Sequence, residues 1–299
     1  MKKLLANLAK RITLPGFQGV PLYNFGMVFT KGIKEGALTM RASSLAYNFF
    51  LAIFPSIIFF FTIIPFVPIR HFQSTLFDLL KEVMPKTAFA AAEETIVDIV
   101  KHQHRKMLSV GFLTALYFST NGIHAMINAF NNTYHQIETR SFIKQRLVSI
   151  LLVVIASLVL IATIIIILYT ELLLGRLPVK HYSIFWIQLG RFISVLILFL
   201  VVISFYYHLG PVNSKGQKFI STGSVLATIL SLSASFGFAY YVNHFGKYNK
   251  LYGSIGALIV VMLWIYFISM VLLLGFELNA SIRSAKLAMS KGEGKATDG

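Results

Sequence analysis

Amide and imidazole side chains recur at helical spacing inside an otherwise apolar stretch. Gaps of three and four residues place them on one face of a helix. The set is Asn121, His124, Asn128, Asn131 and His135. Polar groups are costly against lipid, so this face should contact protein or line a wet cavity that forms a polar pathway. The alternative is hydrogen bonding that only holds helices together, and both interpretations stay open.

Two residues of opposite charge stand at the ends of apolar stretches. Arg41 precedes one stretch, and Glu277 lies about one turn before the end of another. An arginine and a carboxylate can form two parallel hydrogen bonds, which would spare both groups an unpaired burial. We predict a buried ion pair between them. The alternative is a carboxylate that titrates in a proton- or ion-coupled pathway.

The stretch that follows Arg41 carries two further features. Asn48 lies two turns in from Arg41 and joins the expected polar pathway. Pro55 falls in the middle of the stretch. Because proline removes a backbone hydrogen bond, we expect the helix to be broken or kinked there.

Catalytic chemistry has little support in the residue types. The chain has no cysteine, which excludes disulfides, thiolate zinc sites and cysteine nucleophiles. His102 and His104 form the one close histidine pair in the sequence. They lie in a charged loop, where we expect water to solvate them. An enzyme within the membrane would need paired acids, a metal cluster or a nucleophile with its base. The apolar stretches offer only Glu171 and Glu277 as acids, so we expect no catalytic residue, metal site or cofactor.

The composition places these side chains in a membrane. Of the 299 residues, 56% are hydrophobic and 13% are charged, whereas about a quarter of a soluble domain is charged. The net charge of +16 would suit a nucleic-acid partner. The basic residues, however, lie between the apolar runs, where membrane proteins keep them. We therefore expect membrane lipids as partners and no nucleic acid.

Six stretches are long enough to cross a bilayer, which takes about 20 apolar residues. They are 43–69, 108–132, 148–174, 184–209, 219–243 and 254–280. Their length and all-round hydrophobicity predict helices, because a backbone in lipid must satisfy its own hydrogen bonds. The predicted fold class is all-α, a polytopic integral membrane protein with six transmembrane helices.

The segments between these stretches divide the chain. Residues 1–41 should form a basic cytoplasmic segment whose amphipathic helix lies at the membrane interface, or else packs on the bundle. Residues 42–280 should form the membrane domain, with 70–107 as an amphipathic helical insert outside it. Residues 281–299 should form a disordered cytoplasmic tail. The counts of Lys and Arg favour both termini in the cytoplasm.

Small hydroxyl residues mark the fifth stretch. Ser224, Thr228, Ser231 and Ser235 share one face of the expected helix. Small side chains let two helices approach closely in a membrane, so we interpret this face as a packing surface rather than as a chemical site.

Three blocks of the sequence resemble the YihY/BrkB family of bacterial inner-membrane proteins. "RASSLAYNFFLAIFPSI" resembles the start and mid-helix proline of that family's first span, and "AFNNTYH" resembles the end of its second span. "LYGSIGALIVVMLWIYFISMVLLLGFELNA" resembles its last span, which ends in glycine–x–glutamate–x–asparagine. The likeness covers about residues 20–285. It implies six membrane helices in the inner membrane, with both termini cytoplasmic.

The resemblance implies less about activity. Members of the family have been linked to serum resistance and to the export of envelope lipid precursors. The transfer-RNA ribonuclease label that many members carry has no support in these residues. We expect a transporter or flippase-like factor whose cargo is an envelope lipid or an amphiphilic solute. The first alternative is a non-transporting scaffold for envelope biogenesis, and a weaker one is an intramembrane lipid-modifying enzyme.

Overall fold

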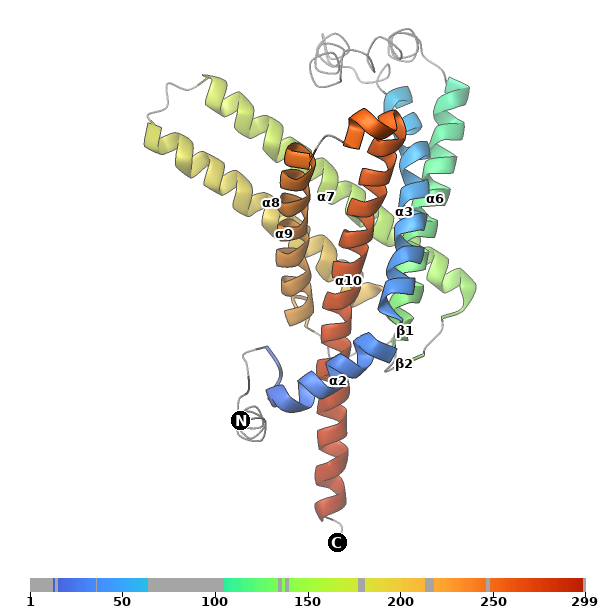
Figure 1. The fold of residues 1–299 in the computed structure, drawn as a ribbon, viewed down its shortest axis with the longest axis vertical. Helices are drawn as coiled ribbons and strands as arrows, with labels where there is room; N and C mark the ends of the chain where they lie inside the picture. Colours follow the sequence, from blue (N-terminus) through green and yellow to red (C-terminus); the bar gives the residue numbers. More distant parts are fainter. Residues whose placement is uncertain are drawn as a thin grey trace. The chain divides into compact units, whose positions relative to one another are not determined.

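The computed structural model describes residues 13, 16–35, 37–63, 105–133, 136–137, 140–176, 181–212, 218–245 and 248–297 (Figure 1). Within these ranges the chain forms seven helices. They are α2 (Leu22–Glu35), α3 (Leu38–Ile63), α6 (Arg105–Asn131), α7 (Phe142–Arg176), α8 (His181–Leu209), α9 (Thr222–Phe245) and α10 (Tyr248–Thr297). The strands β1 (Asn132–Thr133) and β2 (Gln136–Ile137) pair antiparallel after α6. The all-α prediction is thus confirmed for this part of the chain, apart from that short pairing.

Some sequence-based expectations lie outside the described residues. These are His135, the histidines at 102 and 104, and residues 70–104 of the expected insert.

Four helices are long and apolar enough to cross a membrane. The apolar segments are Phe142–Ile167, Ile184–Leu209, Thr222–Tyr241 and Leu258–Met289. They correspond to the last four of the six expected spans. Within the described ranges, a fifth crossing arises only if α2 and the first part of α3 count as one span bent by 60°. The 27-residue α6 is long enough, but its polar side chains keep it out of this group.

The described residues belong to two compact units. The smaller unit holds residues 47–122, which include most of α3 and the first part of α6. Gly122 permits close packing there, because a Cβ atom at this position would lie 2.8 Å from Cδ1 of Phe49. Helix α3 continues through Pro55 to Ile63, and the hydroxyl of Ser56 donates to the carbonyl of Ala52 at 2.7 Å. The proline therefore does not end this helix.

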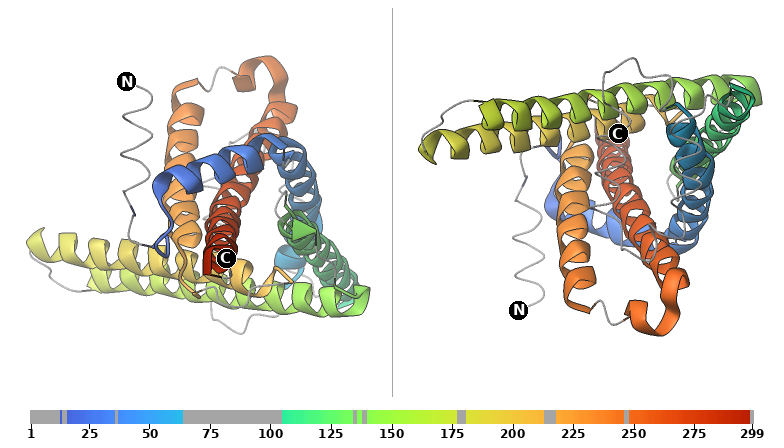
Figure 2. Two further views of the ribbon diagram at one scale, coloured as in Figure 1. Left: turned by 90° about the horizontal axis from the view of Figure 1, so that it is seen from below. Right: turned by 90° about the horizontal axis from the view of Figure 1, so that it is seen from above.

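The larger unit holds residues 1–46 and 123–299 and contains two helical hairpins. Helix α7 packs against α8, α9 packs against α10, and α8 contacts α9. Figures 1 and 2 show the α7–α8 hairpin extending away from the α9–α10 hairpin on the side where α7 leads into α8. One face of α7 carries apolar side chains that are 45–61% exposed, namely Leu147, Leu151, Val154, Leu158, Ile161, Ile165 and Tyr169. Lipid would cover this face in a membrane.

The sequence predicts a disordered tail over 281–299, and in the described residues α10 continues to Thr297. Near the start of this segment, Ile282 and Ala285 are buried with Phe17 and with Phe25 of α2. With 50 residues, α10 measures about 75 Å along its axis at 1.5 Å per residue, and its first turns bend away from the long part that follows (Figure 1).

Helix α2 uses its apolar face within the protein. Phe25 and Phe29 stack with ring centroids 5.2 Å apart, and both pack in the cluster around α10. The amphipathic helix thus packs on the bundle, which is one of the two arrangements expected from the sequence. A position at the headgroup level stays a prediction.

Candidate functional site

The carboxylate of Glu277 is completely buried in α10, next to Arg41 at the start of α3. Nη2 of Arg41 lies 3.3 Å from Oε2 of Glu277, and the two side chains are 11% and 0% exposed. The structure thus brings together the two charges that were paired from the sequence. A buried carboxylate is costly without such a partner.

Arg41 also binds the end of a third helix. Its Nη1 donates to the carbonyl oxygens of Ala129 at 2.9 Å and Asn132 at 3.2 Å. A helix ends in carbonyls that lack intrahelical partners, and a positive charge there is favourable. Arg41 therefore joins α3, α6 and α10. Sequence reasoning missed these acceptors because every residue has a backbone carbonyl.

A second arginine does the same for α8. The guanidinium of Arg140 donates to the carbonyl oxygens of Leu209 at 3.0 Å, Gly210 at 3.1 Å and Pro211 at 2.6 Å. Partial burial lowers the pKa of Arg140, yet an arginine stays charged at neutral pH. The Gly-Pro pair is a signal for a helix end, but it does not indicate which cation will cap it.

The polar residues of α6 that belong to the larger unit each contact a different partner. Oδ1 of Asn128 accepts a hydrogen bond from Nε2 of Gln145 on α7. Oδ1 of Asn131 accepts from the backbone N–H of Val212 at 3.0 Å. The ring of His124 meets that of Phe142 edge-on, with centroids 6.3 Å apart.

The other members of the expected pathway are divided. Asn48 and Asn121 belong to the smaller unit, whereas His124, Asn128 and Asn131 belong to the larger one. Within the larger unit the structure shows contacts of Asn128 with α7 and of Asn131 with the segment after α8, and the shared polar pathway stays a prediction.

Three aromatic rings pack beside the ion pair. Phe130 stacks on Phe276 with centroids 4.3 Å apart, and Tyr207 meets both rings edge-on. The hydroxyl of Tyr207 donates to the carbonyl of Leu272 at 2.6 Å. The cluster fastens α6 and α8 to α10 at the level of Glu277.

Asn279 and Gly275 hold α9 against α10. Oδ1 of Asn279 accepts from the N–H of Gly223 at 2.8 Å, and its Nδ2 donates to Oγ of Ser221 at 2.8 Å. A Cβ atom at Gly275 would lie 2.7 Å from Cβ of Ala227. Gly275 and Asn279 are four residues apart and share a face, while Glu277 points elsewhere. The asparagine was a motif residue in the sequence, but its partners were not predicted.

The buried hydroxyls of α9 agree with the packing interpretation. Ser224, Thr228 and Ser231 are 0–2% exposed. The hydroxyl of Thr228 donates back to the carbonyl of Ser224 at 2.8 Å, within the helix.

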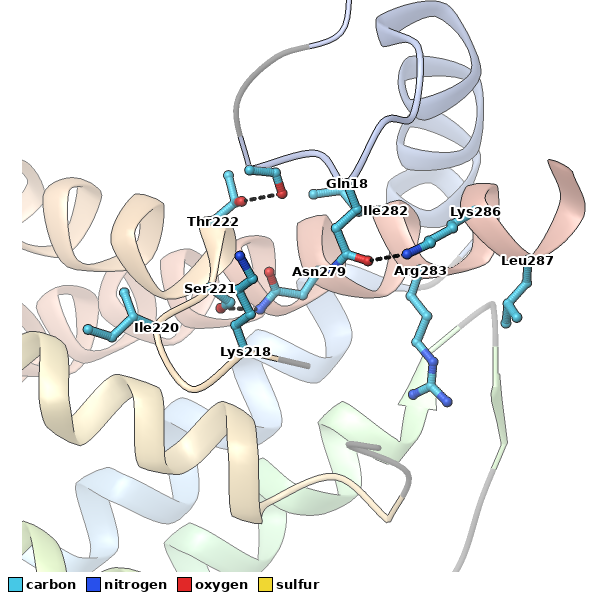
Figure 3. A pocket seen from close by; sticks show the side chains of 11 residues that line it. Gln18, Lys218, Ile220, Ser221, Thr222, Asn279, Ile282, Arg283, Lys286 and Leu287 are labelled. Carbon is cyan, nitrogen blue, oxygen red and sulfur yellow. Dashed lines mark hydrogen bonds between the residues drawn. The ribbon is translucent and has the colours of Figure 1, made fainter. Parts of the chain in front are cut away.

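A pocket of about 550 Å³ opens where α9 begins and the C-terminal part of α10 passes it. Its walls come from three segments, 16–18, 218–222 and 279–287 (Figure 3). Figure 3 shows Lys286 directed toward Gln18 and Lys218 beside Ser221. No sequence pattern indicated this pocket, because its walls are distant in the chain and its lysines resemble ordinary flanking charges of a membrane span.

Comparison with known proteins decides the family. A family model described as Virulence factor BrkB matches residues 29–299, nearly the whole chain. The chain belongs to the BrkB family. The resemblance of the three sequence blocks is thereby confirmed.

BrkB-family relatives are similar along most of their length. The ribonuclease-like protein YfkH of Bacillus subtilis is 31% identical over 253 residues, which are 82% of this chain and 90% of the relative. The UPF0761 membrane protein NTHI0384 of Haemophilus influenzae is 24% identical over 88% of this chain and 96% of its own. A UPF0761 membrane protein of Tolumonas auensis is 26% identical over 86% and 85%. No solved structure matches the chain.

The matched range, 29–299, spans the positions of Arg41, Asn131, Glu277 and Asn279 and begins after Gln18. Among the described residues of this BrkB-family chain, no three His, Cys, Asp or Glu side chains gather to hold a metal ion. The name of the Bacillus relative says only that it is ribonuclease-like.

Proposed function

We propose that this protein moves an amphiphilic envelope lipid across the inner membrane of a bacterium, as a transporter or flippase-like factor. In this proposal α3 and α6 join the four apolar spans to give six crossings. Both termini then lie in the cytoplasm, which agrees with the distribution of Lys and Arg. The end of the bundle that carries Arg41, Arg140 and Glu277 is the cytoplasmic end.

The observation that carries the proposal is the exposure of the spans. In the most apolar window of each of the four spans, only 6–28% of the residues are buried within the protein. Such a bundle offers its apolar faces to lipid. A hydrophilic solute would need an enclosed wet path, whereas a lipid keeps its acyl chains in the bilayer and needs polar contacts only for its headgroup.

The polar groups available for a headgroup lie toward one end of the bundle. Asn128 is exposed on α6 and bonded to Gln145, and the pair of Arg41 and Glu277 lies where α3 and α6 meet α10. The spans therefore offer an apolar surface to acyl chains and polar side chains to a headgroup. This combination supports a lipid cargo rather than a water-soluble one. The same apolar surface would also suit a scaffold that binds membrane enzymes.

Reconstitution separates these functions. The purified protein is placed in phosphatidylcholine vesicles that contain a tail-labelled fluorescent phosphatidylglycerol, and an impermeant quencher reports which leaflet holds the label. We expect label to exchange between leaflets faster than in protein-free vesicles, while a trapped water-soluble anionic dye stays inside. Folded protein that moves neither probe would support the scaffold, and escape of the dye would indicate a solute pathway.

A further inference from the structure

We infer that the pocket between the start of α9 and the C-terminal part of α10 binds a phosphate group, carried by an anionic lipid headgroup or by a free phosphate compound. The inference concerns binding alone. It holds or fails independently of the transport proposed above, because a protein can bind a headgroup without moving it.

The charge of the pocket is of one sign. Lys218, Arg283 and Lys286 line it, and none of the described residues that line it is acidic. Like charges around one cavity raise the local potential and attract an anion. Lysine binds phosphate as a point charge, and arginine can bind it through two parallel hydrogen bonds.

Lys286 has a neutral partner, so its charge is not compensated by that contact. Its Nζ donates to Oε1 of Gln18 at 3.2 Å. Gln18 has a positive φ of 52°, which is uncommon for a residue other than glycine. It lies between Gly16 and Gly19, whose φ values are also positive. This turn directs an amide, rather than a carboxylate, toward the lysine.

The floor of the pocket is fixed by its own hydrogen bonds. The hydroxyl of Thr222 donates to the carbonyl of Gly16 at 2.9 Å, and Asn279 binds Ser221 and the N–H of Gly223. These polar groups are therefore occupied in holding three segments together. The lysines are left as the groups that meet a ligand, on a backbone that does not need to rearrange.

Size and apolar walls suit a phosphate that carries an apolar portion. A volume of about 550 Å³ lies within the roughly 300–1,000 Å³ of small-molecule sites. Ile220 and Leu287 line the pocket and are 53% and 48% exposed. Apolar side chains next to lysines at the end of a membrane span match the junction between a headgroup and its glycerol and acyl chains.

Flanking lysines also set the orientation of membrane proteins without binding any ligand. If orientation is their sole role, the lysines of the pocket and the other lysines at this end should respond equally to phosphate and to anionic lipid. Lys34 on α2 and Lys144 on α7 are exposed and do not line the pocket. They serve as matched controls, because their replacement removes the same number of charges.

The test is the reactivity of individual lysines, read by mass spectrometry after brief acylation. The full-length protein is placed in phosphatidylcholine nanodiscs and modified alone, with inorganic phosphate, or with a minority of phosphatidylglycerol in the disc. We expect Lys218 and Lys286 to be protected while Lys34 and Lys144 keep their rates. Protection by the lipid alone assigns a headgroup, and protection by inorganic phosphate alone assigns a free phosphate compound. Unchanged rates, or equal protection of all four lysines, would overturn the inference.

A binding measurement with variants gives an independent readout. Each lysine near anionic lipid changes affinity roughly fivefold, so Lys218→Gln with Lys286→Gln should weaken binding of tail-labelled phosphatidylglycerol by about 25-fold. Lys34→Gln with Lys144→Gln should change it by less than about twofold, as expected for exposed charges. Equal losses in the two double variants would overturn the site. If Lys218 and Lys286 of the unaltered protein are not protected while lipid flux is normal, the pocket is refuted and the proposed transport stays intact.

Discussion

Arg41 and Glu277 are 236 positions apart in the sequence, and their side chains meet with Nη2 and Oε2 at 3.3 Å. The same guanidinium holds two carbonyls at the end of α6. Arg41 thus connects three helices, and the carboxylate of Glu277 is one of its three hydrogen-bond acceptors. Replacing Arg41 therefore removes more contacts than replacing Glu277.

We predict that Arg41→Gln destabilises the protein more than Glu277→Gln. Breaking a buried pair typically costs about 3–5 kcal/mol, and Arg41→Gln also removes the charged cap of α6. Thermal unfolding of detergent-purified variants measures this, with Lys34→Gln as a control that removes one exposed charge. The reversed pair, Arg41→Glu with Glu277→Arg, should recover little, because glutamate cannot donate to the carbonyls of Ala129 and Asn132. Full recovery by the reversed pair would show that the carbonyl contacts are unimportant.

Glycines on α9 and α10 give a second prediction. Gly275→Ala should destabilise the bundle by about 1–3 kcal/mol, as overpacking does, because the new methyl group would lie 2.6 Å from the hydroxyl of Tyr207. Gly237→Ala, on the same helical pair, has nothing within 4 Å and should be neutral or stabilising by helix propensity. The two variants are compared by unfolding temperature. Equal temperatures would mean that the helices are not in close contact at Gly275.

Cysteine reactivity tests the environment of α6. The chain has no native cysteine, so each introduced thiol reports alone. Asn128→Cys should react in membranes with a small water-soluble thiol reagent, because the position is exposed and the polar pathway requires water there. Cysteines at Ile127 and Phe130, which are 0% and 1% exposed, should be protected. Reaction of Asn128→Cys with membrane-permeant reagents only would place this face against lipid.

Orientation is tested by fusions. A reporter active only outside the cytoplasm should be active after Lys106 and silent after Gly299, because the charge distribution favours cytoplasmic termini. Activity at both sites, or only at the second, would contradict the proposed topology and move the lysine-lined pocket to the other side of the membrane.

The sequence predicted well what depends on local patterns. The four strongest apolar stretches are helices, because length and hydrophobicity leave no other way to satisfy a backbone in lipid. The meeting of Arg41 and Glu277 followed from their shared depth at the ends of two spans. The packing of small residues on α9 followed from their spacing of three and four.

Contacts of backbone groups and of apolar side chains between distant segments were not predictable from the sequence. The burial of Ile282 and Ala285 depends on apolar partners in residues 17–25, and no local signal links the two segments. The carbonyl partners of Arg41 and Arg140 carry no residue-type information. The polar residues of α6 show a different difficulty. Their spacing correctly predicted a helix, but it did not indicate that Asn128 and Asn131 contact different neighbours.

The close approach of α9 and α10 restricts how this protein can move. Gly223 and Gly275 bring the two backbones into contact, and Asn279 locks their register with two hydrogen bonds. Sliding or rotation of one helix on the other would break all of these contacts at once. Helices α9 and α10 therefore behave as a single rigid body. Any change of shape within the larger unit must therefore leave this pair of helices intact.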